Sequence, residues 1–593
     1  MDLANAYGSP RHNLIQFALK WYHIPRHIRE IVFSYYDNLH AVVVLAGTTS
    51  RSFPQAKGVF QGCTLSTILF NTVFNLLFDY LQPTLDRVGY RFVDDETLVL
   101  SSTGYADDVS VITASPEENQ IVLNRVDHFL NWTETIHANP ANCFSLARKQ
   151  VADPKASLQG LTYSTYNPKL KIANVEMKLV LESPFKFLGR NIPHDLNRNV
   201  SREAILSKFQ GLLTKTDEVP LSGTMKLWIY EFVICSKLSW DLMVYDTPDY
   251  FNQSLESLAN RYLKKWTGLA RPASTSIFYR TKSHFGLHLK QVSCMTKKLQ
   301  VVKMHLLKYS TDPNIRAIYA LKLARDKALG SGKWTATVEL EKAERAVELD
   351  RMAARGQSSR QGLGLNTLPP RSTAKDHRQA AILFLESEFE RERLVEDSKL
   401  EMQADWMKWQ HLMNHDLSWK KILYHQGENL LKFLLNATTN TCATQDNLRR
   451  WSITSVGNCK LCHKRQATLL HVLNSCPISI AQPRYLWRHD SLLQEIYYTV
   501  RTHVNLLAAL TKQGKPLRTF PALSESFVKA GQAPGRPRSK RIELLNILGR
   551  SGDWKIQFDL NYGSDYSKVR SRFPAEIAAS PLCPDGVVWS SLA

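Results

Sequence analysis

The sequence has little cysteine for its length, no long uninterrupted hydrophobic run, and fewer acidic than basic residues. Nine cysteines among 593 residues are too few for a disulfide scaffold, so we expect an intracellular, reducing compartment. No basic segment leads into an apolar run near the N-terminus, and we expect no signal peptide. The most apolar stretch, residues 68–81, is interrupted by Asn71, Asn75 and Asp79 and is too short to cross a bilayer. The sequence therefore predicts no membrane partner.

The shortage of acidic residues leaves a strongly basic chain. Lys and Arg outnumber Asp and Glu by 75 to 54, which gives a formal net charge of +21. Such an excess favours a polyanionic partner, because binding releases the counterions of the polyanion. A merely soluble basic protein would have the same composition, so charge alone leaves both possibilities open. The length is sufficient for several domains, each with its own core.

Two adjacent carboxylates, Asp107 and Asp108, lie in the segment 104–111, which begins with a glycine and ends in β-branched residues. This pattern predicts a β-hairpin with the acidic pair at its tight turn. Adjacent aspartates repel each other and lose solvation when packed, and a divalent cation offsets both costs. The alternative is a solvated acidic turn without a ligand, which is the commoner setting of an isolated Asp-Asp pair.

Two other segments precede the acidic pair. In residues 58–66, Gly58 and Gly62 bracket Gln61 just before an apolar helical run over residues 65–81. Glycine lets bare backbone approach a ligand, and a helix start offers free N–H groups to phosphates or sugars. Near the start of the chain, Asp2 is followed five residues later by the aromatic Tyr7. Each segment alone would be an ordinary loop or strand, so the prediction of a functional site depends on their order along the chain.

This ordered set resembles the palm of reverse transcriptases, specifically those of non-long-terminal-repeat retrotransposons. The resemblance implies that Asp2, Asp107 and Asp108 hold two Mg²⁺ ions. One ion would activate the primer 3′-hydroxyl, and the other would stabilise the departing pyrophosphate. The implied partners are an RNA template, a DNA target or primer, and deoxynucleoside triphosphates.

The resemblance also assigns roles around these carboxylates. Tyr7 would lie under the incoming sugar and exclude a 2′-hydroxyl, while Gln61 and Gly62 would line the templating pocket. One departure stands near Asn142, where relatives tend to carry a lysine before the cysteine, and Lys149 is a candidate substitute. The family also has a fingers region before its first palm aspartate, so we expect this chain to be an internal piece or a decayed copy of a longer protein.

The alternation of helical and short β patterns predicts an α/β palm-like core, followed by a mostly helical region. We expect strands at 2–7 and 41–46, the latter buried, and helices at 12–22, 25–39, 65–81 and 116–136. An aromatic, basic strand-turn at 185–189 resembles the family's primer-gripping element. The expected domains are a palm at 1–195, a helical thumb at 196–330, a charged helical connector at 331–445 with a linker at 356–374, a zinc knuckle at 446–490, and a basic linker with a truncated restriction-like nuclease at 491–593.

A second candidate metal site lies at Cys459, Cys462, His471 and Cys476. Cys-x-x-Cys can place two thiolates on one ion, and the following helical stretch can complete a tetrahedron, so a structural Zn²⁺ is expected. The alternative is a set of buried thiols, and His463 is a competing imidazole. The spacing also resembles the zinc knuckle that follows the polymerase in elements encoding a restriction-like endonuclease. The basic and aromatic neighbours suit phosphate contact and stacking; they are Arg449, Arg450, Trp451, Lys460, Lys464 and Arg465.

The C-terminal part carries two weaker signals. The basic, Pro-rich segment 534–541 suits nuclear import or nucleic-acid contact, although a plain linker has the same composition. Segments 554–560 and 584–589 resemble the opening of the restriction-like nuclease, with Asp585 as an incomplete metal site. We therefore expect no DNA cleavage from this chain alone.

Three functions remain open from the sequence. The first is an RNA-directed DNA polymerase fragment, and the second is a catalytically inactive remnant that keeps zinc-dependent nucleic-acid binding. The third is a decayed product that does not fold stably. Primer extension, salt-sensitive binding and cooperative melting distinguish them.

Overall fold

The structure is a computed structural model of the whole chain. It describes residues 1–37, 39–92, 95–152, 161–180, 185–193, 199–281, 284–328, 334–356, 373–407, 427–512, 548, 551–558 and 586–590. The chain forms two compact units, each built from several stretches of sequence. Unit 1 comprises residues 1–215, 233–256 and 295–341, and unit 2 comprises residues 216–232, 257–294 and 342–593.

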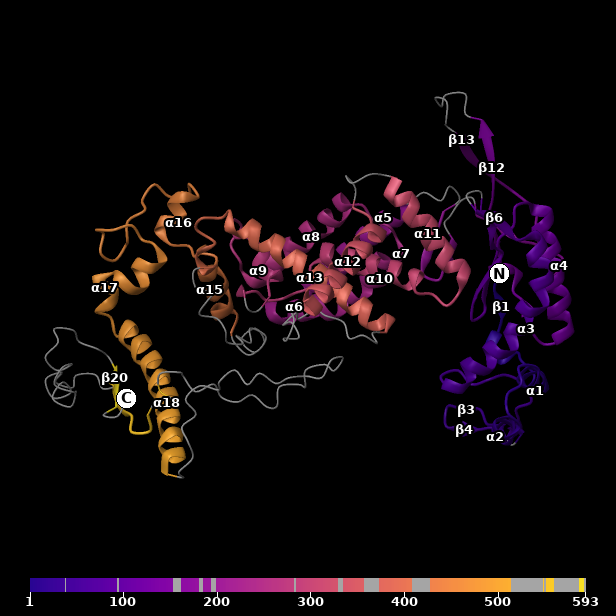
Figure 1. Cartoon of the computed structure of the whole chain (residues 1–593), viewed down its shortest axis with the longest axis horizontal. Helices are drawn as coiled ribbons and strands as arrows, with labels where there is room; N and C mark the ends of the chain where they lie inside the picture. The colour runs from indigo at the N-terminus through magenta and orange to yellow at the C-terminus, as the bar shows by residue number, and fades with distance from the viewer. Residues whose placement is uncertain are drawn as a thin grey trace. The chain divides into compact units, whose positions relative to one another are not determined.

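The core of unit 1 forms around one long helix, α3 (Thr64–Val88). Many of its apolar residues, among them Phe70, Val73 and Leu77, are buried, as the apolar run predicts, although Ile68 is exposed. Helices α1 (His12–Trp21) and α4 (Pro116–Thr133) pack against it (Figure 1). A capping box fixes the start of α4, since Ser115 accepts from the Glu118 N–H and Glu118 accepts from the Ser115 N–H. Helix α2 (Arg26–Asp37) completes the predicted helical set.

Short strands cross this helical core. Strand β1 (Leu3–Ala4) pairs antiparallel with β10 (His137–Ala138), and β8 (Ser102–Tyr105) pairs with β9 (Asp108–Val111). The backbones of Met1 and Val109 also exchange two hydrogen bonds, of 2.8 and 3.1 Å. Residues near the start of the chain therefore lie beside the β8–β9 hairpin.

Two predicted strands need correction. The strand expected over 2–7 is limited to β1, and a 3₁₀ turn follows at Ala6–Gly8. The buried strand expected over 41–46 is wrong: β2 (His40–Ala41) and β3 (Val44–Leu45) are separate, and residues 42–45 are 50–76% exposed. β3 forms a small hairpin with β4 (Thr48–Thr49), and β2 pairs with β5 (Phe53–Pro54). An apolar run thus cannot by itself distinguish a core strand from a hairpin arm.

The described residues of unit 1 form five further strand pairs. They are β6 (Tyr90–Phe92) with β7 (Asp95–Leu100), β11 (Phe144–Ser145) with β16 (Lys178–Leu179), β12 (Ala147–Ala152) with β13 (Leu161–Tyr166), β14 (Lys171–Ile172) with β15 (Val175–Glu176), and β17 (Phe185–Phe187) with β18 (Arg190–Ile192). The predicted strand-turn at 185–189 is confirmed, with Leu188 and Gly189 at positive φ in the turn.

The region after residue 199 is mainly helical, as predicted. Its helices are α5 (Asn199–Glu218), α6 (Gly223–Ile229), α7 (Cys235–Val244), α8 (Asp249–Thr267), α9 (Ser276–Tyr279), α10 (Val292–Lys308), α11 (Pro313–Ala328), α12 (Ala336–Gly356) and α13 (Ala374–Ser398), with a π-helical turn at Tyr230–Ile234. The linker expected at 356–374 lies almost entirely outside the described residues. In unit 2, the buried Arg280 contacts Asp397 on α13 and the Trp406 ring, so an ion pair lies inside this core.

The C-terminal part of unit 2 contains α15 (Glu428–Thr438), α16 (Gln445–Arg450), a π-helical turn (His471–Ser475), α17 (Pro477–Ile480) and α18 (Pro483–Lys512). A hairpin of β19 (Lys555–Phe558) and β20 (Gly586–Trp589) follows. Among the described residues, no helix has both the length and the apolar character needed to cross a membrane.

Candidate metal centres

The acidic pair lies at the tip of the β8–β9 hairpin, as predicted. Tyr105 pairs with Asp108, so Ala106 and Asp107 form a two-residue turn. Ala106 has a φ of 53°, a left-handed conformation that costs energy for a residue with a Cβ. Gly104 is required by packing, because a Cβ there would lie 2.5 Å from the Phe78 ring of α3. The hairpin is therefore held rigidly against the core helix.

Asp2 is held beside this hairpin by residues of the β10 region. Its Oδ2 accepts from Asn142 Nδ2 at 2.9 Å and from Asn139 Nδ2 at 3.2 Å. Its backbone oxygen accepts from the Asn139 N–H at 2.9 Å, and its N–H donates to the buried Cys143 Sγ at 3.4 Å. Two amides thus fix the Asp2 carboxylate, and sequence reasoning did not find this support.

The three carboxylates are close enough to act on one another electrostatically. The pKa of Asp108 is raised above its usual range by partial burial, then by the negative charges of Asp107 and Asp2. A concentration of carboxylates of this kind suits a divalent cation, although the N-terminal ammonium offsets part of the charge. In the part of the chain that the structure describes, however, the three aspartates do not form a group of converging ligand atoms. Mutual repulsion opposes closer approach until cations neutralise it.

The predicted nucleotide-binding residues lie near the first turns of α3. The Tyr7 ring stacks on Phe70 with centroids 5.0 Å apart, and its hydroxyl lies 3.5 Å from Thr67 Oγ1. The Tyr7 carbonyl accepts from the Val59 N–H at 2.7 Å, which ties it to the glycine loop. Within that loop, a Cβ on Gly58 would lie 3.0 Å from the Gly8 backbone. The close contact of two glycines therefore joins the first and second predicted motifs.

Gln61 and Gly62 form the exposed turn just before α3. Gly62 has a φ of +90°, which only glycine adopts readily, and both residues are solvent-accessible. The helix begins after Cys63, whose thiol pKa is lowered by hydrogen bonds from the Ser66 and Leu65 N–H groups. The start of α3 thus lies directly beside Gln61 and Gly62, and the Cys63 thiol accepts hydrogen bonds from two of its first-turn N–H groups.

The candidate substitute lysine has its own contact. Lys149 lies on β12, and its ammonium lies 5.9 Å from the centroid of the Tyr166 ring on β13. This contact is internal to the β12–β13 hairpin. The structure therefore shows Asn142, rather than Lys149, at the Asp2 carboxylate.

The second candidate centre is a converging group of three thiols and one imidazole. Potential ligand atoms of Cys459, Cys462, His471 and Cys476 all lie within 4.8 Å of one another. The Cys459 and Cys476 sulfurs are 3.9 Å apart, and Cys462 Sγ lies 3.3 Å from His471 Nε2. A tetrahedral zinc with S ligands at about 2.3 Å would place two sulfurs about 3.8 Å apart. The spacing thus fits one zinc ion with a closed shell.

Local structure explains why these four residues converge. Asn458 and Gln466 form an antiparallel bridge around the Cys459–Cys462 turn. Burial alone would raise the pKa of the Cys476 thiol, but hydrogen bonds from the Ser479 and Ile478 N–H groups and from neighbouring thiols lower it, which favours the ligating thiolate. His463 is exposed at a φ of 59° and does not belong to the group.

The basic residues near the cluster are of two kinds. Arg449 and Arg450 form ion pairs with the buried Asp446, at 3.7 and 2.7 Å, so much of their charge is compensated within α16. Lys460, Lys464 and Arg465 are exposed around the cysteine turn. Only the second group is well placed for contact with an external phosphate.

The predicted nuclease opening is only partly covered by the structure. Asp585 and the basic segment 534–541 lie outside the described residues. The flanking segments do form the β19–β20 hairpin, with Ile556 opposite Val588. The incomplete nuclease site at Asp585 therefore stays a prediction.

Comparison with protein families gives two matches. Residues 1–192 match the family of reverse transcriptases (RNA-dependent DNA polymerases), and residues 403–482 match a zinc-binding region found in reverse transcriptases. The first match contains all three aspartates and the glycine loop. The second contains the four residues of the cysteine-histidine cluster.

Curated relatives come from retrotransposable elements named R2. The chain is 20% identical over 350 residues to a retrovirus-related Pol polyprotein from Nasonia vitripennis, covering 59% of this chain and 32% of the relative. It is 22% identical over 311 residues to one from Drosophila melanogaster, covering 52% and 28%, and 23% identical over 328 residues to one from Popillia japonica, covering 54% and 43%. The chain thus spans about a third of the length of these relatives. It carries the reverse transcriptase domain and the zinc-binding region of a non-long-terminal-repeat retrotransposon protein.

Proposed function

We propose that residues 1–195 form the palm of an RNA-directed DNA polymerase that copies element RNA from a nicked DNA primer by two-metal nucleotidyl transfer. The observation that carries this proposal is the position of Asp2 beside the Asp107–Asp108 hairpin, where burial and then the charges of Asp107 and Asp2 raise the pKa of Asp108. The family match of residues 1–192 supports the same reaction class. The expected partners are an RNA template, a DNA primer or target, and deoxynucleoside triphosphates.

Asp2, Asp107 and Asp108 would hold two Mg²⁺ ions, because they bring three carboxylates, which are hard oxygen donors, into electrostatic contact, and bound cations would offset their mutual repulsion. Two bound ions would supply activation of the primer hydroxyl and stabilisation of pyrophosphate. The protein's own contribution is orientation. Asn139 and Asn142 hold Oδ2 of Asp2 and so fix its carboxylate, and the α3 contact at Gly104 fixes the hairpin that carries Asp107. Tyr7, stacked on Phe70, would lie under the incoming sugar.

Primer extension on an RNA template with Mg²⁺ tests the proposal. The chain is expected to extend the primer, and Asp107→Asn is expected to lose activity by roughly 10³-fold, because a metal ligand supplies several kcal/mol. Asp86→Asn is the matched control, since Asp86 is an exposed aspartate of α3. Extension that survives in Asp107→Asn would contradict the proposal.

A second function, zinc-dependent nucleic-acid binding without polymerisation, is favoured by the cysteine-histidine cluster. Its geometry fits structural Zn²⁺, and Lys460, Lys464 and Arg465 present positive charge around it. On this proposal the segment following the polymerase is a zinc knuckle, with residues 196–330 as thumb and 331–445 as connector. A nuclear location would suit such binding and the predicted role of segment 534–541.

Binding and chemistry can be separated experimentally. Cys459→Ser is expected to weaken binding of a labelled nucleic acid and to reduce its salt dependence, because the basic turn loses its fixed geometry. If the chain extends no primer but binds in this zinc-dependent way, the second function replaces the first. Unchanged binding in Cys459→Ser would exclude the second function.

A further inference from the structure

A row of aromatic rings lies on the exposed surfaces of α1 and α4 in unit 1. The Phe17 ring centroid is 6.1 Å from that of Trp21 on α1 and 5.8 Å from that of Trp132 on α4. Phe17, Trp21 and Trp132 are 45%, 57% and 51% exposed. Large aromatic side chains usually lie in cores, and a contiguous exposed group of them marks a binding surface. These three residues form a candidate binding surface, the aromatic platform.

The core of unit 1 supports the aromatic platform from below. Phe129, one turn before Trp132 on α4, is buried, and its ring centroid lies 5.5 Å from that of Trp132. The Phe129 ring also lies 5.9 Å from that of Tyr80 on α3. Both α1 and α4 pack on α3. The exposed rings are therefore fixed on a rigid base, which reduces the entropy lost when a ligand stacks on them.

Two cations lie beside the platform, Arg125 on α4 and Lys20 on α1, and both are exposed. Arg125 Nη1 donates to the Tyr80 hydroxyl at 3.0 Å, and its Nε donates to Thr84 Oγ1 at 3.4 Å. Its guanidinium carbon lies 5.1 Å from the centroid of the Tyr80 ring. These partners are neutral, and among the described residues Arg125 forms no ion pair. The guanidinium is thus held in place while its charge stays available to an anion.

The carboxylates near the platform leave part of this positive charge uncompensated. Glu134, two residues after the α4 tryptophan, forms an ion pair with Arg11. Asp79 accepts a hydrogen bond from the Tyr22 hydroxyl at 2.6 Å, so its own charge is not paired with a cation there. The two cations beside the platform therefore exceed this one carboxylate by one positive charge.

The platform lies on the opposite side of α3 from the candidate polymerase site. Phe78 packs against Gly104 of the β8–β9 hairpin, whereas Tyr80 contacts Phe129 and His128 of α4. Residues two positions apart in an α-helix project about 200° apart around its axis. A ligand on the platform would therefore leave the carboxylate site free.

We propose that the aromatic platform binds a single-stranded nucleic acid by base stacking, at a site separate from the polymerase site. Exposed rings stack on bases of any sequence, and a guanidinium beside them can contact a backbone phosphate. A double helix covers its base faces, so the platform selects single strands. A wholly apolar partner would instead bury Arg125 and Lys20 without an anion, which is costly. The proposal does not depend on polymerase activity.

Photocrosslinking to the whole chain locates the bound strand. The probes are an RNA and a DNA oligomer of the same pyrimidine sequence that carry 5-iodouracil, and excess unlabelled RNA–DNA duplex fills the proposed polymerase site. Mass spectrometry is expected to find crosslinks within residues 12–22 and 125–133 that persist with the duplex. Both probes should react, because stacking needs no 2′-hydroxyl. Crosslinks elsewhere only, or crosslinks that disappear with the duplex, would overturn the proposal.

The affinity of variants separates stacking from apolar contact. Trp21→Leu/Trp132→Leu keeps apolar side chains but removes two aromatic faces, and Trp21→Tyr/Trp132→Tyr is the matched control that keeps both. With excess duplex present, fluorescence anisotropy should show roughly 10-fold or more loss of oligomer affinity for the leucine variant and little loss for the tyrosine variant. Because both positions are exposed, all three chains should melt at the same temperature.

The same variants exclude the competing explanations. Loss of affinity in the leucine variant alone supports the proposal, even if the chain extends no primer. Equal affinity in all three chains would overturn it. Sedimentation of the native chain as a dimer that the leucine variant abolishes, with oligomer affinity unchanged, would also overturn it, because the platform would then be an interface between two copies.

Discussion

The two candidate metal centres are built in opposite ways. The zinc cluster takes its four ligands from residues 459–476, and their atoms already converge. The carboxylate site takes its ligands from residue 2 and residues 107–108, and no such convergence occurs among them. A structural ion can become part of a small local fold, whereas a site that binds and releases ions with each substrate keeps repulsion among its ligands. The difference separates a permanent metal from an exchangeable one.

Removing a zinc ligand should have the largest effect on the structure, through loss of the metal ion. Cys476→Ser is expected to lose the zinc ion, because structural zinc sites bind with apparent free energies of about 10–16 kcal/mol that depend on the full ligand set. The measurements are zinc content by mass spectrometry and limited proteolysis of residues 446–482. His463→Ala should keep one zinc per chain, since His463 lies outside the cluster. Full zinc content in Cys476→Ser would contradict the assignment.

A substitution at Gly104, where the β8–β9 hairpin packs on α3, should have a moderate effect on the free energy of unfolding. Gly104→Ala would place a Cβ 2.5 Å from the Phe78 ring, and overpacking of this kind costs about 1–3 kcal/mol. Chemical denaturation should show the loss, and Phe78→Leu in the same chain should restore part of it by making room. If Gly104→Ala is as stable as the unchanged chain, the hairpin does not depend on α3.

Weakening the support of Asp2 should affect metal affinity more than the fold. Asn142→Ala removes the 2.9 Å bond to Oδ2, and loss of a group that orients a metal ligand costs about 10–100-fold in metal affinity or activity. The Mg²⁺ concentration for half-maximal primer extension should rise, and excess Mg²⁺ should restore the rate. A decrease that is the same at every Mg²⁺ concentration would argue against this role.

The smallest expected effect concerns pH. Because the pKa of Asp108 is raised in the folded state, the fold binds its proton more tightly than the unfolded chain. Without Mg²⁺, the stability of the native chain should therefore fall as the pH rises from the ordinary aspartate pKa through the raised one. Asp108→Asn should remove this loss and melt at a higher temperature near neutral pH. At acidic pH the two chains should melt alike, and a lower melting temperature for the variant at neutral pH would show the opposite sign.

Sequence patterns predict the local features of this molecule well. An apolar run after the glycine loop locates α3, the alternating residues after Asp108 locate β9, and Cys-x-x-Cys spacing locates the zinc cluster. Patterns failed at residues 41–46, where an apolar run forms exposed hairpin arms. They also could not find Asn142 beside Asp2, because that contact depends on the pairing of β1 with β10.

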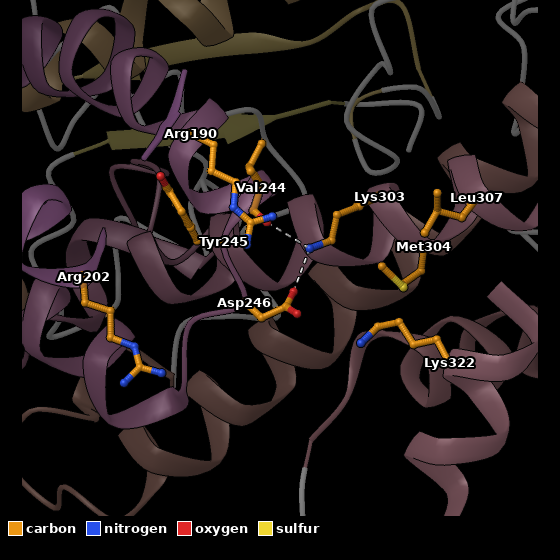
Figure 2. A pocket seen from close by; sticks show the side chains of 9 residues that line it. All are labelled: Arg190, Arg202, Val244, Tyr245, Asp246, Lys303, Met304, Leu307 and Lys322. Carbon is orange, nitrogen blue, oxygen red and sulfur yellow. Dashed lines mark hydrogen bonds and ion pairs between the residues drawn. The ribbon is translucent and has the colours of Figure 1, made fainter. Parts of the chain in front are cut away.

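A cavity of unit 1 lined in part by Arg190, Lys303 and Lys322 (Figure 2) shows the same limit of sequence reasoning. Arg190, Lys303 and Lys322 are far apart in the chain, and each would be read as an ordinary surface cation. Their convergence depends on the packing of β18, α10 and α11 within unit 1. Residue spacing in the sequence thus predicts a site whose residues lie within one short segment. A site assembled from distant segments can be located only when the fold is known.

The central claim is that Asp2 and the Asp107–Asp108 hairpin form one divalent-cation site. Iron-directed cleavage tests it most directly: Fe²⁺ replaces Mg²⁺, peroxide and ascorbate generate radicals at the bound ion, and mass spectrometry maps the cut backbone. We expect cuts beside Asp2 and within residues 105–109, suppressed by excess Mg²⁺ and absent in Asp107→Asn. Cuts at only one of the two segments, or cuts that persist in Asp107→Asn, would contradict a shared site.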